Sequence, residues 1–283
     1  MRWIKQSEQN YFIKDFLVQS EAVVLILVGF LGLYFGGIFV NKVHIFPSPF
    51  VDCQFLLIPP AVGLFSILLV CNLFYKISIL VLFEIRSSKN LSLRLTLLLF
   101  GIFFLLTLIS FVLDFGYHID DIQPKTNIDV FLSSNILIVS ILLFQVTFEE
   151  IVFRRLIYNI IGNYISTQSI AIIISGFIFS MAHAMNFEYE VYGFSYLISI
   201  FIVGVFLQYL FLETNSLALP ILIHFTSNLL SLFVLQLESL QLDIPSLFVR
   251  TNFSVWTDMI ILLLQIVIFV FLFKRIKPSL NEN

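Results

Sequence analysis

Charged residues are scarce in this chain. Only 12% of its 283 residues are Asp, Glu, Lys or Arg, whereas 59% are hydrophobic, and the mean hydropathy is +1.02. Soluble domains carry about 25% charged residues. The shortage therefore excludes a soluble enzyme, a disordered tail and a collagen. With a net charge of −3 the chain also has no basic surface for nucleic acid, so we expect no nucleic-acid partner.

Cysteine is nearly absent as well. The two cysteines, Cys53 and Cys71, are isolated from each other in the sequence. Two such residues make neither a disulfide framework nor a zinc cluster. We interpret both as small apolar residues, because free cysteine is commonly buried.

Long apolar runs fill most of the chain. Each is long enough to cross about 30 Å of hydrocarbon, and helices satisfy their own backbone groups in lipid. The runs cover about 22–40, 55–75, 91–113, 132–161, 168–185, 194–212, 216–236 and 254–273. They predict an all-α fold class, a polytopic transmembrane bundle of about eight spans in a lipid bilayer. We expect residues 21–283 to form this single domain and residues 1–20 to form an amphipathic segment at the membrane interface.

Glycines mark one face of the first span. Gly32 and Gly36 form a G-x-x-x-G pattern, with Gly29 and Gly37 beside it. Small residues at this spacing let two membrane helices approach closely. We therefore predict that this face packs against another helix.

The few basic residues predict the orientation. With an even number of spans both termini share a side, and that side carries ten Lys and Arg residues, namely Arg2, Lys5, Lys14, Lys76, Arg86, Lys89, Arg94, Lys274, Arg275 and Lys277. The other side carries Lys42, Lys125 and Arg250. The excess places both termini in the cytoplasm. The richness in Phe and Ile and the low Ala content suggest an AT-rich genome, so we favour the plasma membrane of a bacterium.

Ionisable residues inside predicted spans are costly, and each is a candidate functional residue. Glu150 and Arg154 are four residues apart and share a helix face, which also suits a buried ion pair between helices. That interpretation leaves Glu149 unexplained, because it lies about 100° further round the helix. Two adjacent carboxylates favour proton uptake by one of them, which is how a general base is tuned.

Two further polar clusters lie in later spans. Phe179 and His183 are four residues apart, as are His224 and Asn228. Taken alone, His183 fits the interpretation of a packing residue with a hydrogen bond. His224 and Asn228 alone fit that of a pair that forms hydrogen bonds between helices. At 1.5 Å per residue, Glu149, His183 and His224 lie roughly 20, 24 and 15 Å along their helices from the inner turns. These depths are compatible with one site.

The ordered trio E-E-x-x-x-R (149–154), F-x-x-x-H (179–183) and H-x-x-x-N (224–228) resembles the CPBP family of intramembrane proteases. This family includes the CAAX prenyl proteases and bacterial Abi-type and bacteriocin-processing relatives. The resemblance covers about residues 130–235, the expected protease-like core. Arg155 is a departure, because many relatives carry glycine after the arginine.

The resemblance implies roles for the matching residues. Glu149 would be the general base that activates water, and His183 would position that water. His224 and Asn228 would stabilise the oxyanion. Glu150 and Arg154 would form a supporting pair, and Phe179 would be a wall of the pocket. Peptide hydrolysis needs such a base, a held water and donors where charge develops.

Metal dependence is a separate question. Glu149, His183 and His224 offer a carboxylate and two imidazoles, which is the ligand set of many catalytic zinc sites. The sequence has no H-E-x-x-H pattern. We therefore favour a mechanism with no cofactor, and Zn²⁺ is the alternative.

Two other functions fit the same residues. A proton-coupled transporter could use them as a relay, but the first half of the chain has no counterpart of the polar cluster. A non-catalytic scaffold or immunity protein of the same fold is the other possibility. As an endopeptidase, the protein would act on a prenylated C-terminal peptide, a leader peptide or a membrane-protein segment.

Overall fold

The computed structural model describes residues 19–43, 51–75, 82–83, 92–126, 128–240, 245–252 and 254–280. Most of these residues are helical. The α-helices are α2 (Gln19–Lys42), α3 (Val51–Val70), α5 (Leu93–Tyr117), α6 (Ile128–Glu150), α7 (Tyr158–Tyr164), α8 (Gln168–Ala182), α9 (Phe187–Tyr192), α10 (Phe194–Thr214), α11 (Ala218–Leu229) and α12 (Val255–Leu280). Of the segment 1–20 predicted to be interfacial, residues 1–18 lie outside the described residues.

Several helices continue into tighter or wider turns. Three are π-helical segments: η1 (Cys71–Tyr75) after α3, η3 (Ile151–Ile157) between α6 and α7, and η4 (Leu230–Val234) after α11. Two short 3₁₀ segments, η2 (Ile119–Asp121) and η5 (Glu238–Leu240), adjoin the strands. π-Helical turns inside α-helices are rare and often lie at functional sites.

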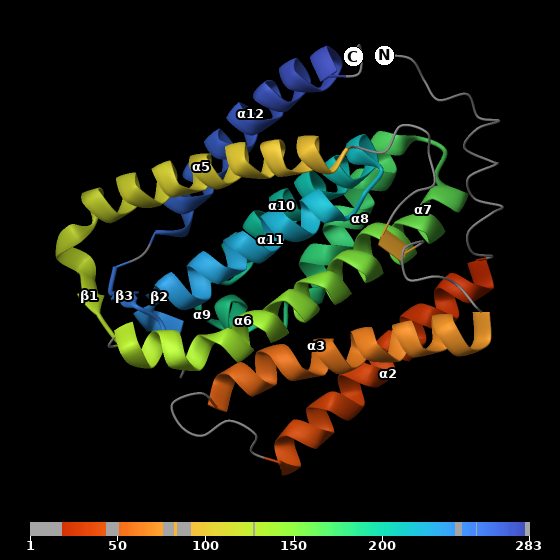
Figure 1. Cartoon of the computed structure of the whole chain (residues 1–283), viewed down its shortest axis with the longest axis horizontal. Coiled ribbons are helices and arrows are strands. Elements are labelled where there is room, and N and C mark those ends of the chain that lie inside the picture. Colours follow the sequence, from red (N-terminus) through yellow and green to blue (C-terminus); the bar gives the residue numbers. More distant parts are fainter. Residues whose placement is uncertain are drawn as a thin grey trace.

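The helices pack in three groups (Figure 1). α6, α8, α10 and α11 form the centre, with the pair α2 and α3 on one side and the pair α5 and α12 on the other. α3 packs against α6, and α5 packs against α11. The segment that carries the three polar clusters therefore lies between two outer pairs of helices.

Helices occur at all eight predicted positions, and five of them are long and apolar enough to cross a membrane among the described residues. These five comprise residues Ser20–Lys42, Leu57–Tyr75, Leu93–Tyr117, Phe194–Thr214 and Val255–Ile276. Two others, Gln168–Ala182 and Ala218–Val234, are apolar but shorter. The chain is thus a multi-pass helical membrane protein, while the count of eight spans and the cytoplasmic termini stay predictions.

A small sheet departs from the all-α prediction. β1 (Ile122–Pro124), β2 (Leu235–Leu237) and β3 (Phe248–Arg250) pair in the order β1-β3-β2. β3 is antiparallel to β1, with Gln123 opposite Val249, and parallel to β2, with Gln236 opposite Val249. Three-residue strands leave too short a pattern in the sequence for the alternation test to detect.

Arg250 at the end of β3 is not the exposed loop residue that the orientation count assumed. Its side chain is 2% exposed. Nη1 lies 2.7 Å from Oδ2 of Asp114 on α5, and Nη2 lies 3.5 Å from Oδ1 of Asp258 on α12. The ion pairs tie the sheet to the outer helix pair at this end of the molecule.

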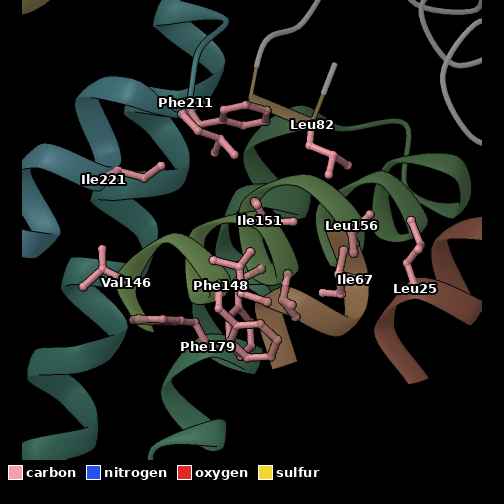
Figure 2. Close-up of a cluster of buried hydrophobic side chains, with 14 of the residues drawn as sticks. Leu25, Ile67, Leu82, Val146, Phe148, Ile151, Leu156, Phe179, Phe211 and Ile221 are labelled. Atoms are coloured by element: carbon pink, nitrogen blue, oxygen red, sulfur yellow. The ribbon is translucent and has the colours of Figure 1, made fainter. Parts of the chain in front are cut away.

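Two clusters of buried apolar side chains hold the helices together. The larger joins α2, α3, α6, η3, α8, α10 and α11, and Figure 2 shows part of it around Phe148, Ile151 and Phe179. The second joins α5, α10, α11 and α12 through residues such as Phe103, Leu207 and Phe269. α10 and α11 contribute to both clusters, whereas α6 and α8 contribute to the larger one, so every central helix is held by buried apolar contacts.

The glycine face of α2 packs against α3, as the sequence predicts. A Cβ atom on Gly32 would lie 2.8 Å from the Cα of Gly63, and one on Gly36 would lie 2.8 Å from the Cα of Pro59. Gly37 differs, because a Cβ there would meet nothing within 4 Å. Gly32 and Gly36 therefore permit backbone contact, which is the usual function of G-x-x-x-G.

We predict that Gly32→Ala destabilises the protein, while Gly37→Ala on the same helix does not. The added methyl at Gly32 meets backbone atoms that cannot move aside, and such overpacking costs about 1–3 kcal/mol. At Gly37 only the better helix propensity of alanine acts. Thermal unfolding in detergent micelles measures both variants. Equal unfolding midpoints would contradict the close contact between α2 and α3.

Candidate active site

Glu149 and Glu150 end α6, directly before the π-helical segment η3. The six residues Ile151–Leu156 of η3 are all buried. Glu150 is fully buried, whereas the Glu149 side chain is 13% exposed. The two carboxylates therefore have different surroundings although they are adjacent in sequence.

Glu150 forms a buried ion pair with Arg154. Arg154 Nε lies 3.1 Å from Glu150 Oε2, and both side chains are 0% exposed. A second arginine nitrogen, Nη2, lies 3.4 Å from Oε1. This is the ion pair that the four-residue spacing predicts, and it lies wholly inside the protein.

The same carboxylate also holds His224 from α11. His224 Nδ1 lies 2.9 Å from Glu150 Oε1. Because a carboxylate paired with arginine only accepts hydrogen bonds, Nδ1 must carry the proton and donate it. Neutral His224 then has its lone pair on Nε2, which faces away from Glu150.

His183 is oriented in a similar way by a backbone group. Its Nδ1 lies 2.8 Å from the carbonyl oxygen of Phe179. A carbonyl only accepts, so this imidazole also donates from Nδ1 and presents Nε2 elsewhere. The residue caps the C-terminus of α8, which ends at Ala182, and it is not inside a helix that continues to residue 185 as predicted.

Glu149 lies where the two imidazoles converge. Its Oε2 atom is 3.8 Å from His183 Nε2 and 3.7 Å from His224 Nε2. Oε2 is buried and accepts no hydrogen bond from any residue that the structure describes. The other oxygen, Oε1, accepts a hydrogen bond from Gln145 Nε2 at 3.1 Å. Three segments of the chain thus meet at one carboxylate oxygen, that of Glu149, beside His183 and His224. The similar depths estimated from the sequence are compatible with this short separation.

Phe179 packs in the middle of this group. Its ring lies 4.2 Å below the guanidinium carbon of Arg154, a cation–π contact. Its centroid is 4.5 Å from that of His183 and 6.0 Å from that of His224. The side chain is almost fully buried. It therefore supports the ion pair and both imidazoles from one position.

Asn228 lies one turn after His224 on α11, two residues before η4 begins. It is half-buried. Within the described part of the chain its side-chain amide makes no hydrogen bond with Glu149, His183 or His224. The structure therefore places Asn228 on the expected helix and joins only the first three groups directly.

Two features escaped the sequence analysis. The hydrogen bond from Gln145 to Glu149 spans one helical turn, so the Q-x-x-x-E spacing was a usable signal. The bond between His224 and Glu150 joins residues 74 apart in sequence, and no local pattern reports it.

Another carboxyl group lies near His183. Glu188 is on the short helix α9, which the sequence analysis treated as a loop between spans. Burial raises the pKa of this carboxyl, whereas a hydrogen bond from its own backbone and the nearby His183 act in the opposite direction. A second carboxyl group besides Glu149 therefore lies close enough to His183 to interact with it.

Glu149, His183 and His224 have the side-chain types that bind metals, but their positions fit a metal ion less well. Glu149, His183 and His224 are zinc-ligand types, and each imidazole has its second nitrogen fixed by an acceptor, as metal-binding histidines do. Yet within the described residues no group of three His, Cys, Asp or Glu side chains is placed to hold a metal ion. We therefore derive no step through a metal.

Residues 131–230 match the family model described as Type II CAAX prenyl endopeptidase Rce1-like. The matched segment runs from α6 to the start of η4, so it contains all three motifs and the four central helices. A search of curated proteins and a search of solved structures each found no match. The central segment thus carries a domain of the CAAX protease family, which is a family of membrane proteases.

We predict that Arg154→Met is strongly destabilising. It leaves the Glu150 carboxylate buried without its main countercharge, which typically costs about 3–5 kcal/mol. The double variant Glu150→Gln with Arg154→Met should unfold at a higher temperature than Arg154→Met alone, because no net charge is then buried. Lys274→Met, at an exposed position of α12, is the control and should change little. A double variant less stable than the single would contradict this account.

Proposed function

We propose that the protein is an intramembrane endopeptidase that hydrolyses a peptide bond with water activated by Glu149. The proposal rests on the surroundings of the Oε2 atom of Glu149. It is buried, it accepts no hydrogen bond within the described residues, and it faces the Nε2 atoms of His183 and His224. A carboxylate oxygen kept free of donors beside two oriented imidazoles is suited to accept a proton from water.

In this proposal the water lies between the carboxylate and the imidazoles. It donates one hydrogen bond to Glu149 Oε2 and one to His183 Nε2. As its oxygen attacks the carbonyl carbon of the substrate, the proton that faces Glu149 is transferred to that carboxylate. The proton taken by Glu149 then passes to the nitrogen of the leaving amine as the C–N bond breaks. Each residue thus ends the cycle in the protonation state in which it began.

The developing oxyanion needs donors. Asn228 supplies an amide N–H from the same face of α11 as His224. His224 donates from Nε2 only when it carries a second proton, which it would take up from solvent before the attack and keep until the products leave, and the Glu150 carboxylate 2.9 Å from Nδ1 would stabilise that imidazolium. We therefore assign Asn228 and protonated His224 as the donors to the oxyanion.

The substrate that we propose is membrane-associated. The family description supports a prenylated C-terminal peptide, and a leader peptide or a membrane-protein segment fits the same chemistry. We propose the plasma membrane of a bacterium as the location, on the composition alone.

Glu149→Gln should abolish cleavage and leave the fold intact. The amide keeps the shape of the side chain but cannot take the proton of water. The measurement compares the N- and C-terminal peptides of membranes from cells that express wild-type protein, the variant or neither. Asp120→Asn, an exposed carboxylate in η2, is the matched control and should cleave like the wild type. Full activity of Glu149→Gln would remove the proposed mechanism.

Metal removal should leave activity unchanged. Purified protein in detergent is treated with a chelator, and its activity is followed on a peptide with a cleavage site found in the membrane comparison. We expect the same rate before and after treatment, because the base and both imidazoles are held by protein groups. Activity that is lost and then restored by Zn²⁺ alone would show that the Zn²⁺ alternative is correct.

A further inference from the structure

The two oxygens of the Glu149 carboxylate are not equivalent. Oε1 accepts the hydrogen bond from Gln145 Nε2 at 3.1 Å, whereas Oε2 faces the two imidazoles and accepts none among the described residues. Without a donor, the carboxylate group of a glutamate rotates easily about its Cγ–Cδ bond, because that torsion has a broad energy minimum. A donor bound to one oxygen therefore fixes the plane of the carboxylate and keeps the other oxygen turned toward the imidazoles.

The Gln145 amide donates to Glu149 in an orientation that leaves its own oxygen, Oε1, without a hydrogen bond among the described residues. Its Oε1 atom is buried and has no hydrogen-bond donor among the described residues. A buried carbonyl oxygen without a donor is unfavourable, because it has lost its hydrogen bonds to water. The reverse orientation would place the amide oxygen against a carboxylate oxygen, which is repulsive.

The position of Gln145 is set by the packing of α6. Gln145 lies one turn before Glu149, so their side chains share a helix face. Its neighbours Leu142 and Val146 are fully buried in the larger cluster, which holds this turn in place. The donor therefore does not depend on a loop or on a second helix.

We infer that Gln145 is a positioning residue for the proposed reaction. It fixes Glu149 through Oε1 and so directs Oε2 to the water. The inference rests on the proposed function. The alternative is an ordinary hydrogen-bonded pair of side chains on one helix, which adds slightly to helix stability and has no effect on the reaction rate.

Two substitutions separate these cases. Gln145→Met keeps the length of the side chain and removes the donor, so kcat should fall about 10–100-fold, as for other groups that orient a reacting side chain, with little change in KM. Gln145→Glu places a carboxyl at the same point. When that carboxyl holds a proton it can donate to Glu149, and when it is ionised it repels Glu149. The activity of Gln145→Glu relative to Gln145→Met should therefore rise as the pH is lowered.

A matched control is available on α12. Gln265 is a buried glutamine that, like Gln145, donates a hydrogen bond from Nε2, in this case to Thr107 Oγ1 on α5 at 2.5 Å. Gln265→Met should lower the unfolding temperature and leave kcat unchanged. The comparison removes any general effect of deleting a buried amide.

The assay uses full-length protein in detergent and a peptide with a cleavage site that depends on wild-type protein in the membrane comparison. Wild-type kcat in both Gln145 variants, with an inactive Glu149→Gln, overturns the inference and leaves the proposed function standing. A lowered kcat whose ratio between the two variants does not change with pH also overturns it. An active Glu149→Gln, or no cleavage by the wild type, overturns the proposed function and the inference together.

Discussion

The structure depends on the pairing of one buried carboxylate. Glu150 is fully enclosed, and an ionised carboxylate there is tolerable only with a countercharge and hydrogen bonds. Arg154 supplies the charge from η3, and His224 supplies a hydrogen bond from α11. Phe179 packs under the arginine from α8. One acidic group thus fixes the relative positions of three central helices and the orientation of an imidazole.

Glu149 can then differ from Glu150 although both end the same helix. Glu150 uses its oxygens to hold Arg154 and His224, so neither oxygen is free to take a proton from water. Glu149 needs only Gln145 on one oxygen and keeps the other for chemistry. Adjacent residues on a helix point about 100° apart, which is enough to place one carboxylate in the packed interior and the other toward His183.

Sequence patterns predicted the parts of the structure that arise from local physics. The lengths of the apolar runs predicted the positions of the helices. The four-residue spacings predicted the Glu150–Arg154 ion pair and the helix face that Phe179 shares with His183. The small sheet, the buried position of Arg250 and the bond between His224 and Glu150 join segments far apart in the chain, where no spacing rule applies. The end of α8 at Ala182 was missed because the residues after it are still largely apolar. Gln145 was missed although its spacing was visible, because an uncharged side chain was not treated as costly in a span.

The irregular backbone of the chain lies where the chemistry is expected. η3 follows Glu150, His183 caps the end of α8, and η4 begins two residues after Asn228. At membrane depth a backbone that departs from the α-helix is tolerated only when protein, not lipid, surrounds it. The outer helices meet this requirement: the apolar window of α12 is only 11% buried inside the protein, whereas Ile151–Leu156 of η3 are all buried. The outer pairs α2 with α3 and α5 with α12 therefore enclose the central helices, which can bend, widen and stop at the residues that bring Glu149, His183 and His224 together.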